Sequence, residues 1–289
     1  MMKRYGSVEA GGTKFICAVG NENNEIIISE TIPTTTYAET IKKVILFFKQ
    51  NTVDALAIGS FGPVDLDISS DQYGCILNTP KQGWTNVNIV LPIQKELNIP
   101  IFFTTDVNSS AYGEMYLNSC NNLVYYTIGT GIGGSAIQNG VFIGGVGHPE
   151  MGHQLIKKHS LDVNFKGVCP LHGDCLEGLA SGPSIEARTG KKGQELDASS
   201  DVWDIQAYYI AQAILNATLV IRPELVIVGG GVMSQNHMLE RIKTHFKRLL
   251  NNYVTIENID KYIKTPSVEN NGSATIGNFL LAKNLLIKN

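Results

Sequence analysis

The sequence has no long apolar run and no marked excess of charge of either sign. No apolar stretch approaches the roughly 20 residues that a membrane-spanning helix needs, and the N-terminus lacks the apolar segment of a secretory signal. The formal net charge is −3, so nothing in the electrostatics favours a nucleic acid or an anionic membrane as a partner. We therefore expect a soluble, cytoplasmic protein that binds neither nucleic acids nor membranes.

Charged residues are also few, at 17% of the chain, whereas hydrophobic residues make up 43% and can form a substantial core. The length of 289 residues is typical of two domains of ordinary size. The five cysteines are an odd number in a chain without a secretory signal, which favours thiols over disulfides.

A cluster of cysteine and histidine residues lies near the middle of the sequence. Its members are His153 and the motif Cys169-x-x-His172-x-x-Cys175. Zn²⁺ prefers four nitrogen or sulfur ligands in a tetrahedron, and structural sites leave no open position. We expect these four residues to bind a structural zinc ion; a disulfide beside two surface histidines is the alternative. A zinc hydrolase would need the open metal position that four protein ligands do not leave.

Two carboxylates lie beside these predicted ligands. Glu150 precedes His153, and Glu177 follows Cys175. An ionised carboxylate only accepts hydrogen bonds, so a carboxylate held in place by a neighbouring metal site suits the vicinal hydroxyls of a ligand. This pattern indicates a polyol or a sugar.

Glycine-rich turns follow strand-like segments at three places. They are Gly11-Gly12-Thr13-Lys14, residues 129–134 and Gly229-Gly230-Gly231. Such turns can present backbone N–H groups to an anion or approach a flat ligand closely, although each could also be an ordinary tight turn. The first two lie between strands and could hold phosphates; neither is a Walker P-loop.

Strands and helices alternate in two sets, before and after residue 117, which predicts two α/β domains facing a cleft. A buried strand at residues 55–60 ends in a loop containing Gly62 and Pro63, at the strand end where ligands bind in open α/β sheets. Asp106 lies where a strand at residues 101–105 meets a helix. It could be a helix N-cap, a catalytic base or both.

These motifs, in this order, resemble the ROK family of sugar kinases and repressors over nearly the whole chain. The motifs are Glu9-Ala10-Gly11-Gly12-Thr13-Lys14, residues 59–64, Thr105-Asp106-Val107-Asn108, residues 128–134, Glu150-Met151-Gly152-His153, residues 169–177 and Gly229-Gly230-Gly231-Val232. The run His148-Pro149-Glu150-Met151-Gly152-His153 and the cysteine cluster make the resemblance closest to the zinc-containing fructokinase branch. The repressors carry an N-terminal helix-turn-helix domain, and because this chain begins at the kinase domain the resemblance implies a kinase.

The resemblance implies two actin-like, ribonuclease-H-like domains that close on ATP and a sugar. The smaller domain would comprise residues 1–117 with the C-terminal helix 272–289, and the larger domain residues 118–271. The implied activity is ATP-dependent phosphorylation of D-fructose at its 6-hydroxyl, with Mg²⁺ bound to ATP, in a homodimer. A kinase for glucose, mannose or an N-acetylated amino sugar, and a sugar-sensing protein without catalysis, are the alternatives.

The resemblance also assigns roles to residues, with Asp106 as the general base and His153, Cys169, His172 and Cys175 as the zinc ligands. The substrate-binding residues would be Gly62, Pro63, Thr105, Asn108, Glu150, His153 and Glu177. The phosphates would meet Gly11, Gly12, Thr13, Lys14, Thr130 and Gly131. The adenosine side would be lined by Pro183, Gly231, Val232, Met233, Ser234 and Gln235.

Three positions depart from the family pattern. Glu9 replaces the usual aspartate of the first phosphate motif, which bears on its link to Mg²⁺ through water. Thr105 replaces the asparagine often found before the catalytic aspartate, which alters one sugar hydrogen bond. Cys169-x-x-His172 replaces the Cys-x-Cys-Gly of the glucokinase members and favours the fructokinase branch.

Overall fold

A computed structural model describes residues 2–145, 147–269 and 272–287, and the chain divides into two compact units. Unit 1 comprises Met1–Ser119, Ile143–His148 and Ser267–Asn289; unit 2 comprises Cys120–Phe142 and Pro149–Pro266. The predicted second domain, residues 118–271, also included residues 118–119, the segment Ile143–His148 and residues 267–271, which the structure joins to unit 1 instead. Within the described ranges, no helix has both the length and the apolar character needed to cross a membrane.

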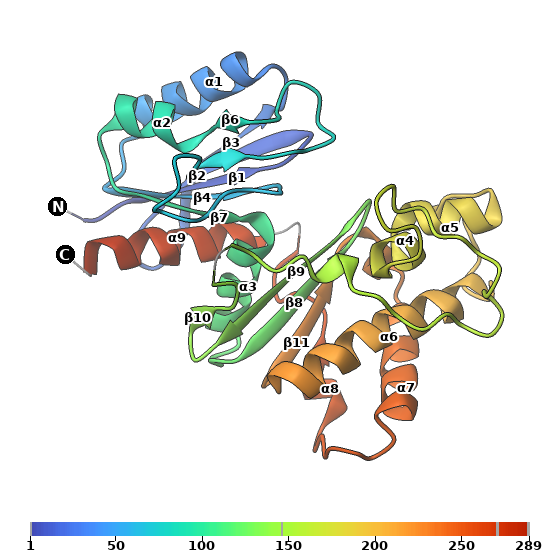
Figure 1. The fold of residues 1–289 in the computed structure, drawn as a ribbon. Coiled ribbons are helices and arrows are strands. Elements are labelled where there is room, and N and C mark those ends of the chain that lie inside the picture. Colours follow the sequence, from blue (N-terminus) through green and yellow to red (C-terminus); the bar gives the residue numbers. More distant parts are fainter. Residues whose placement is uncertain (1, 146, 270–271, 288–289) are drawn as a thin grey trace. The chain divides into compact units, whose positions relative to one another are not determined.

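Unit 1 is built on a mixed sheet with helices on both faces (Figure 1). Its elements are β1 (Tyr5–Ala10), β2 (Lys14–Gly20), β3 (Ile26–Pro33), α1 (Tyr37–Gln50), β4 (Ala55–Ser60), β5 (Cys75–Ile76), β6 (Val87–Asn88), α2 (Val90–Leu97), β7 (Ile101–Thr105), α3 (Asp106–Leu117) and α9 (Gly272–Ile287). The main sheet has the order β3-β2-β1-β4-β7. Strands β1, β2 and β3 pair antiparallel, whereas β1, β4 and β7 pair parallel. Every residue of β4 is buried, as expected for a parallel strand covered on both faces.

The C-terminal helix α9 completes unit 1 through buried polar contacts. Asn278 donates from Nδ2 to Ser7 Oγ at 3.0 Å and accepts from Ser109 Oγ at 2.7 Å, which ties α9 to β1 and to α3. The fully buried Glu114 of α3 accepts hydrogen bonds from the backbone N–H of Ser267 and from the hydroxyl of Ser273. Burying a polar group costs free energy unless it is hydrogen-bonded, so these contacts favour one position and orientation of α9.

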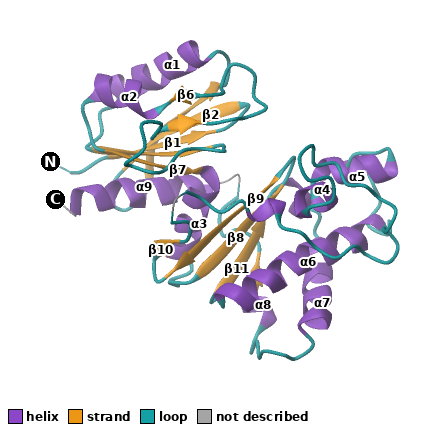
Figure 2. Ribbon diagram, viewed as in Figure 1, coloured by secondary structure: helices purple, strands orange, loops and turns teal. Residues whose placement is uncertain are grey.

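Unit 2 repeats the strand pattern of unit 1 (Figure 2). Its elements are β8 (Leu123–Ile128), β9 (Ile132–Gln138), β10 (Val141–Phe142), the short 3₁₀ helices η1 (Met151–His153), η2 (Gly193–Glu195) and η3 (Gly231–Ser234), α4 (Leu176–Ala180), α5 (Gly182–Thr189), α6 (Val202–Ile221), β11 (Leu225–Gly229), α7 (Met238–Leu250), α8 (Ile259–Tyr262) and β12 (Ile263–Lys264). The sheet order is β10-β9-β8-β11-β12, with antiparallel pairs on the β10 side and parallel pairs on the β12 side. In each unit the first two strands form a hairpin, and the first of them also pairs in parallel with a later strand of the same sheet.

Candidate active site and metal centre

The four predicted zinc ligands come together in unit 2. They lie on the Cys/His loop (residues 153–175), which runs from η1 to the start of α4. The Sγ atom of Cys169 lies 3.7 Å from Nδ1 of His153 and 3.8 Å from Nδ1 of His172, and Sγ of Cys175 lies 3.6 Å from Nδ1 of His153. All four ligand atoms lie within 4.8 Å of one another.

These distances fit a tetrahedral metal site. With metal–sulfur and metal–nitrogen bonds of about 2.3 and 2.1 Å, neighbouring sulfur and nitrogen ligands of zinc lie about 3.6 Å apart. Both cysteines are buried free thiols, so the alternative of a disulfide is wrong. Burial and the adjacent Cys169 raise the pKa of the Cys175 thiol, and a bound cation is what makes two adjacent thiolates favourable.

Gly152 places the first ligand because it lets η1 lie directly on β9. A Cβ atom built on Gly152 would meet the carbonyl oxygen of Ile132 at 1.8 Å, so any side chain here would push η1 off the strand. The backbone N–H of His153 bonds to the carbonyl of Glu150 at 3.0 Å, which holds the exposed Glu150 at the start of the same turn. Since Nδ1 of His153 lies close to both thiols, this atom is placed to be a ligand of a metal ion bound there.

Glu177 is hydrogen-bonded to the second of the two predicted phosphate turns. Its Oε2 accepts a hydrogen bond from the backbone N–H of Ile132 at 2.9 Å. A Cβ atom on Gly131 would lie 2.8 Å from the same oxygen, so glycine is needed there to make room for the carboxylate. The turn is closed by Gly129 N–H to Gly131 O at 2.8 Å. One contact thus links a predicted sugar-binding carboxylate to a predicted phosphate-binding turn.

In unit 1, Asp106 is the first residue of α3 and Thr105 is its N-cap. The Oγ1 atom of Thr105 accepts a hydrogen bond from the backbone N–H of Asn108 at 3.0 Å. The predicted alternative in which Asp106 is the N-cap is therefore wrong. Asn108 is buried and donates from Nδ2 to Thr104 at 2.9 Å. With the cap filled by a neighbour, the carboxyl group of Asp106 is available for another role.

The environment of Asp106 suits a proton acceptor. Burial, with the neighbouring Glu9 carboxylate second, raises its pKa from the ordinary value of 3.8 to about 7. Its Oδ1 accepts a hydrogen bond from the backbone N–H of Val107 at 2.9 Å, which opposes the rise. A general base works best when its pKa lies near the operating pH.

The predicted loop Gly62–Pro63 follows β4 in unit 1 and is fixed from two sides. The carbonyl of Pro63 accepts from Leu77 N at 2.8 Å, and the backbone N–H of Val64 donates to Nε2 of His148 at 3.3 Å. His148 begins the motif His148–His153, and the sequence alone indicates no role for it. The structure shows it as a support for this loop, reached from the segment Ile143–His148.

The first of the two predicted phosphate turns joins β1 to β2. The backbone N–H of Gly11 donates to Lys14 O at 3.0 Å, and Thr34 ties the turn to the end of β3 through bonds to Gly11 O and Thr13 O. Its two chain neighbours aside, no heavy atom of the described residues lies within 4 Å of a Cβ atom built on Gly12, so the side of the turn where a side chain would point is open. The ammonium of Lys14 is exposed at the same turn.

A cavity of about 690 Å³ within unit 2 brings together most of the predicted adenosine-side residues. The predicted residues that line it are Thr130, Pro183, Gly231, Val232, Ser234 and Gln235. Gly131 and the buried Met233 are not among its lining residues. Its volume falls in the range of roughly 300–1,000 Å³ typical of small-molecule sites.

Gly129, which begins the predicted phosphate turn at residues 129–134, also lines the cavity. The lining residues that no prediction included are Gly182, Ile185, Glu186, Lys192, Gly193, Gln194 and Trp203. Ile185 and Glu186 follow Pro183 on α5, and a proline in the first turn of a helix is a sequence signal that could have indicated them. Residues 192–194 and Trp203 come from a connection and a distant helix, and no sequence motif marks them. Glu186 and Lys192 add a negative and a positive charge to an otherwise neutral wall.

Comparison with known proteins adds family membership to this geometry. The model of the ROK family matches residues 5–285. The chain belongs to the ROK family. A fructokinase from Lactococcus lactis subsp. cremoris is 56% identical over 285 residues, which cover 98% of each chain. A fructokinase from Streptococcus mutans is 56% identical over 290 residues, which cover 99% of each.

Solved structures of ROK proteins share the fold. The ROK hexokinase from Thermus thermophilus superposes with a TM-score of 0.80 at 20% identity, covering 99% of this chain and 100% of its own. A ROK glucokinase from Streptomyces griseus in complex with glucose and AMPPNP gives a TM-score of 0.74 at 21% identity, covering 98% and 100%. The predicted α/β, actin-like fold and the predicted family are confirmed.

Proposed function

We propose that this ROK protein is an ATP-dependent fructokinase that phosphorylates D-fructose at the 6-hydroxyl. The observation that carries the proposal is 56% identity to two fructokinases over nearly the whole of each chain. The cavity in unit 2 supports a nucleoside-sized ligand, and the ionisable site around Asp106 supports proton abstraction.

In this proposal Asp106 takes the proton of the 6-hydroxyl as that oxygen attacks the γ-phosphorus of ATP. The bond between the γ-phosphorus and the β–γ bridging oxygen breaks, and ADP leaves. Phosphoryl transfer depends mainly on positioning and charge neutralisation, and a positioned base contributes about 10²–10⁴-fold. Glu150, and the side of Glu177 away from Ile132, accept hydrogen bonds from sugar hydroxyls, and Gly62, Pro63, Thr105, Asn108 and His153 complete the sugar site. The turns at Gly11–Lys14 and Thr130–Gly131 hold the phosphates.

Two metal ions complete the proposal. Mg²⁺ supplies charge neutralisation to the phosphates of ATP, and the negative charge of Glu9 beside Asp106 suits a nearby cation. Zn²⁺ in the Cys/His loop holds Glu150 and Glu177 in place, since four protein ligands leave no position for substrate. The thiolates of this site need a reducing compartment, which supports the cytoplasm. The homodimer that the family resemblance implies remains part of the proposal.

The decisive experiment is a coupled assay with ATP across fructose, glucose, mannose and an N-acetylated amino sugar, with the product position read by phosphorus NMR. We expect fructose to give the highest kcat/KM and fructose 6-phosphate to be the product. A glucokinase from Halalkalibacterium halodurans is 28% identical over 84% of this chain, so glucose is the most informative competitor. A higher kcat/KM for glucose or mannose would show that this sugar, and not fructose, is the preferred substrate. The absence of phosphoryl transfer to every sugar would favour the alternative of a sugar-sensing protein without catalysis.

A further inference from the structure

We propose that Asp162 and Arg188 form a latch that couples the Cys/His loop to the nucleotide cavity, so that zinc and nucleotide strengthen each other's binding. The inference rests on the proposed function in that the ligands are Zn²⁺ and the nucleotide of a kinase. Both partners of the latch, the loop and the cavity belong to unit 2.

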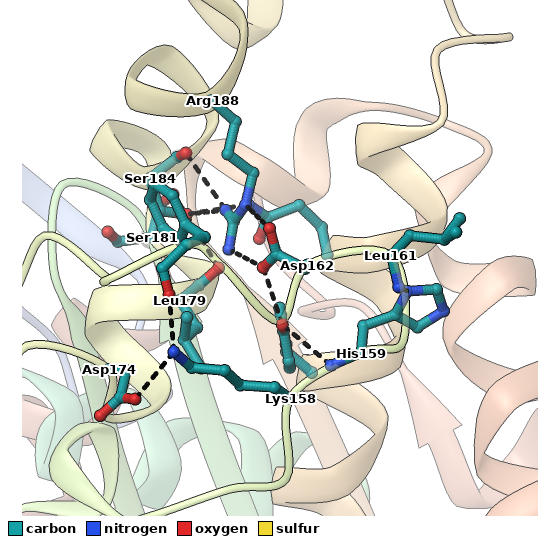
Figure 3. Close-up of polar contacts among 12 residues, drawn as sticks. Lys158, His159, Leu161, Asp162, Asp174, Leu179, Ser181, Ser184 and Arg188 are labelled. Atoms are coloured by element: carbon teal, nitrogen blue, oxygen red, sulfur yellow. Dashed lines mark hydrogen bonds and ion pairs between the residues drawn. The ribbon is translucent and has the colours of Figure 1, made fainter.

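The latch is a buried, bidentate ion pair (Figure 3). Nε of Arg188 donates to Oδ1 of Asp162 at 3.0 Å, and a terminal nitrogen donates to Oδ2 at 2.7 Å. Both side chains are only 7% exposed. The parallel, two-bond geometry fixes orientation as well as distance, and removing one partner would leave the other charge buried and unpaired. The two chain segments that carry these residues are therefore expected to move as one.

Asp162 lies in the middle of the Cys/His loop, between the first metal ligand and the other three. Besides Arg188, it accepts a hydrogen bond from the hydroxyl of Tyr209 on α6 at 2.7 Å. The same hydroxyl accepts from the backbone N–H of His159 at 3.0 Å. The loop is also held across its width by Lys158, which donates to the carbonyl of Phe165 and pairs with Asp174 next to Cys175 (Figure 3). Because these hydrogen bonds and this ion pair connect the parts of the loop, a shift of the metal ligands is expected to shift Asp162 as well.

Arg188 lies near the end of α5 and reaches the start of that helix through Ser184. Its second terminal nitrogen donates to Ser184 O at 3.1 Å and to Ser184 Oγ at 2.9 Å, and the guanidinium lies 3.9 Å from the ring centroid of Phe165. The Ser184 hydroxyl in turn bonds to the carbonyls of Leu179 and Ser181. This network fixes the junction between α4 and α5 (Figure 3).

The α4–α5 junction is part of the nucleotide cavity. The backbone N–H of Gly182 bonds to the carbonyl of Gly129 at 2.7 Å, which joins the start of α5 to the phosphate turn. Pro183, Ile185 and Glu186 of α5 all line the cavity. A ligand that orders this wall also orders Arg188, and through the latch it orders the loop that holds the metal.

Such coupling is reciprocal at equilibrium: a nucleotide that binds better to the zinc-loaded protein must raise zinc affinity by the same factor. The effect is measurable without catalysis. Zinc affinity is determined by competition with a chromophoric chelator, with and without saturating Mg·ADP, on the zinc-loaded full-length protein. In the wild type we expect Mg·ADP to raise zinc affinity about fivefold or more. In Asp162→Asn, and in Arg188→Lys, which keeps the charge but loses the fork, we expect a change of less than about twofold.

A matched control separates coupling from stability. Asp260→Asn removes another carboxylate of unit 2, one that pairs with Lys243 away from the cavity, and should keep the full Mg·ADP effect. The quantity compared is the ratio of zinc affinity with Mg·ADP to zinc affinity without it. A purely structural role of the latch would lower both affinities equally and leave this ratio unchanged. If Asp162→Asn does not fold, Tyr209→Phe removes one bond to Asp162 and should reduce the ratio part-way.

The outcomes distinguish this inference from the proposed function. A wild type that phosphorylates fructose and binds Mg·ADP, but shows the same ratio in Asp162→Asn, overturns the latch and leaves the function intact. A wild type in which calorimetry detects no Mg·ADP binding overturns both. A ratio of about five or more that falls towards one in the latch variants, and only there, supports the coupling.

Discussion

Replacing Asp106 by asparagine removes a carboxyl group whose ionised form is costly in the folded protein. Burial, followed by the Glu9 carboxylate, raises the pKa of Asp106 from 3.8 to about 7. At about 1.4 kcal/mol per pKa unit, that difference corresponds to about 4 kcal/mol. Between pH 3.8 and 7 the folded protein binds this proton more tightly than the unfolded chain, so the stability contribution falls as pH rises and is constant above about pH 7.

Asparagine copies the neutral carboxyl group and can still accept the hydrogen bond from the backbone N–H of Val107. We therefore expect Asp106→Asn to be more stable than the wild type at pH 8, with a gain of up to about 4 kcal/mol and a Tm higher by at most about 10 °C. At pH 5 the gain should be less than half as large. We expect kcat to fall by about 10²–10⁴-fold because the base is lost.

The assay combines calorimetric Tm values at pH 5, 6, 7 and 8 with the coupled kinase assay at each pH. A Tm difference that does not grow with pH would show that Asp106 is not held with a raised pKa. A kcat within tenfold of the wild type would show that it is not the base. The two readouts are independent, so each part of the reasoning can fail alone.

Further predictions concern the surroundings of Asp106, the Cys/His cluster and the predicted sugar-binding residues. Glu9→Gln removes a charge that raises the pKa of Asp106, so the acidic limb of the kcat/KM profile for fructose should move to lower pH; an unmoved limb contradicts this. Removal of zinc by a strong chelator should lower Tm and kcat together, with both restored by added Zn²⁺, and full activity in metal-free protein would contradict it. Gly131→Ala places a methyl group 2.8 Å from Oε2 of Glu177, so KM for fructose should rise at least about tenfold, measured by the same assay. His148→Ala removes an acceptor that supports the loop after β4 and should raise KM for fructose, whereas His148→Gln should restore part of the loss; equal values for both variants would argue against that support.

The Cys/His cluster could be predicted because its chemistry is local. Cys169, His172 and Cys175 lie within one short segment, and cysteine and histidine at this spacing have few other uses in a chain with an odd number of thiols. Asp106 was harder, since a residue between a strand and a helix can be a cap or a base. The structure removes the first option, because the side chain of Thr105 is the cap. Threonine and aspartate are both common N-cap residues, so one sequence cannot tell which of these two neighbours fills the position.

The rest of the cavity wall and the latch could not be predicted, because their residues meet only through tertiary packing. Asp162 and Arg188 are separated by 26 positions, and Asp162 stands in a loop without periodicity. Trp203 reaches the cavity from a helix whose apolar residues read simply as core. The segment Ile143–His148 returns to unit 1 without any helix or strand signal, so the predicted second domain ran straight through it.

The division of the chain has a consequence for biosynthesis. Unit 2 ends at Pro266, whereas unit 1 needs α9, which seats Asn278 against β1 and α3. A ribosome that makes the chain from its N-terminus therefore releases all of unit 2 before the last piece of unit 1. The N-terminal part of unit 1 is therefore expected to stay incompletely folded, with the surface that α9 covers exposed, until the end of the chain is made. A stop codon shortly before Gly272 should prevent unit 1 from completing its fold, while unit 2 can still fold.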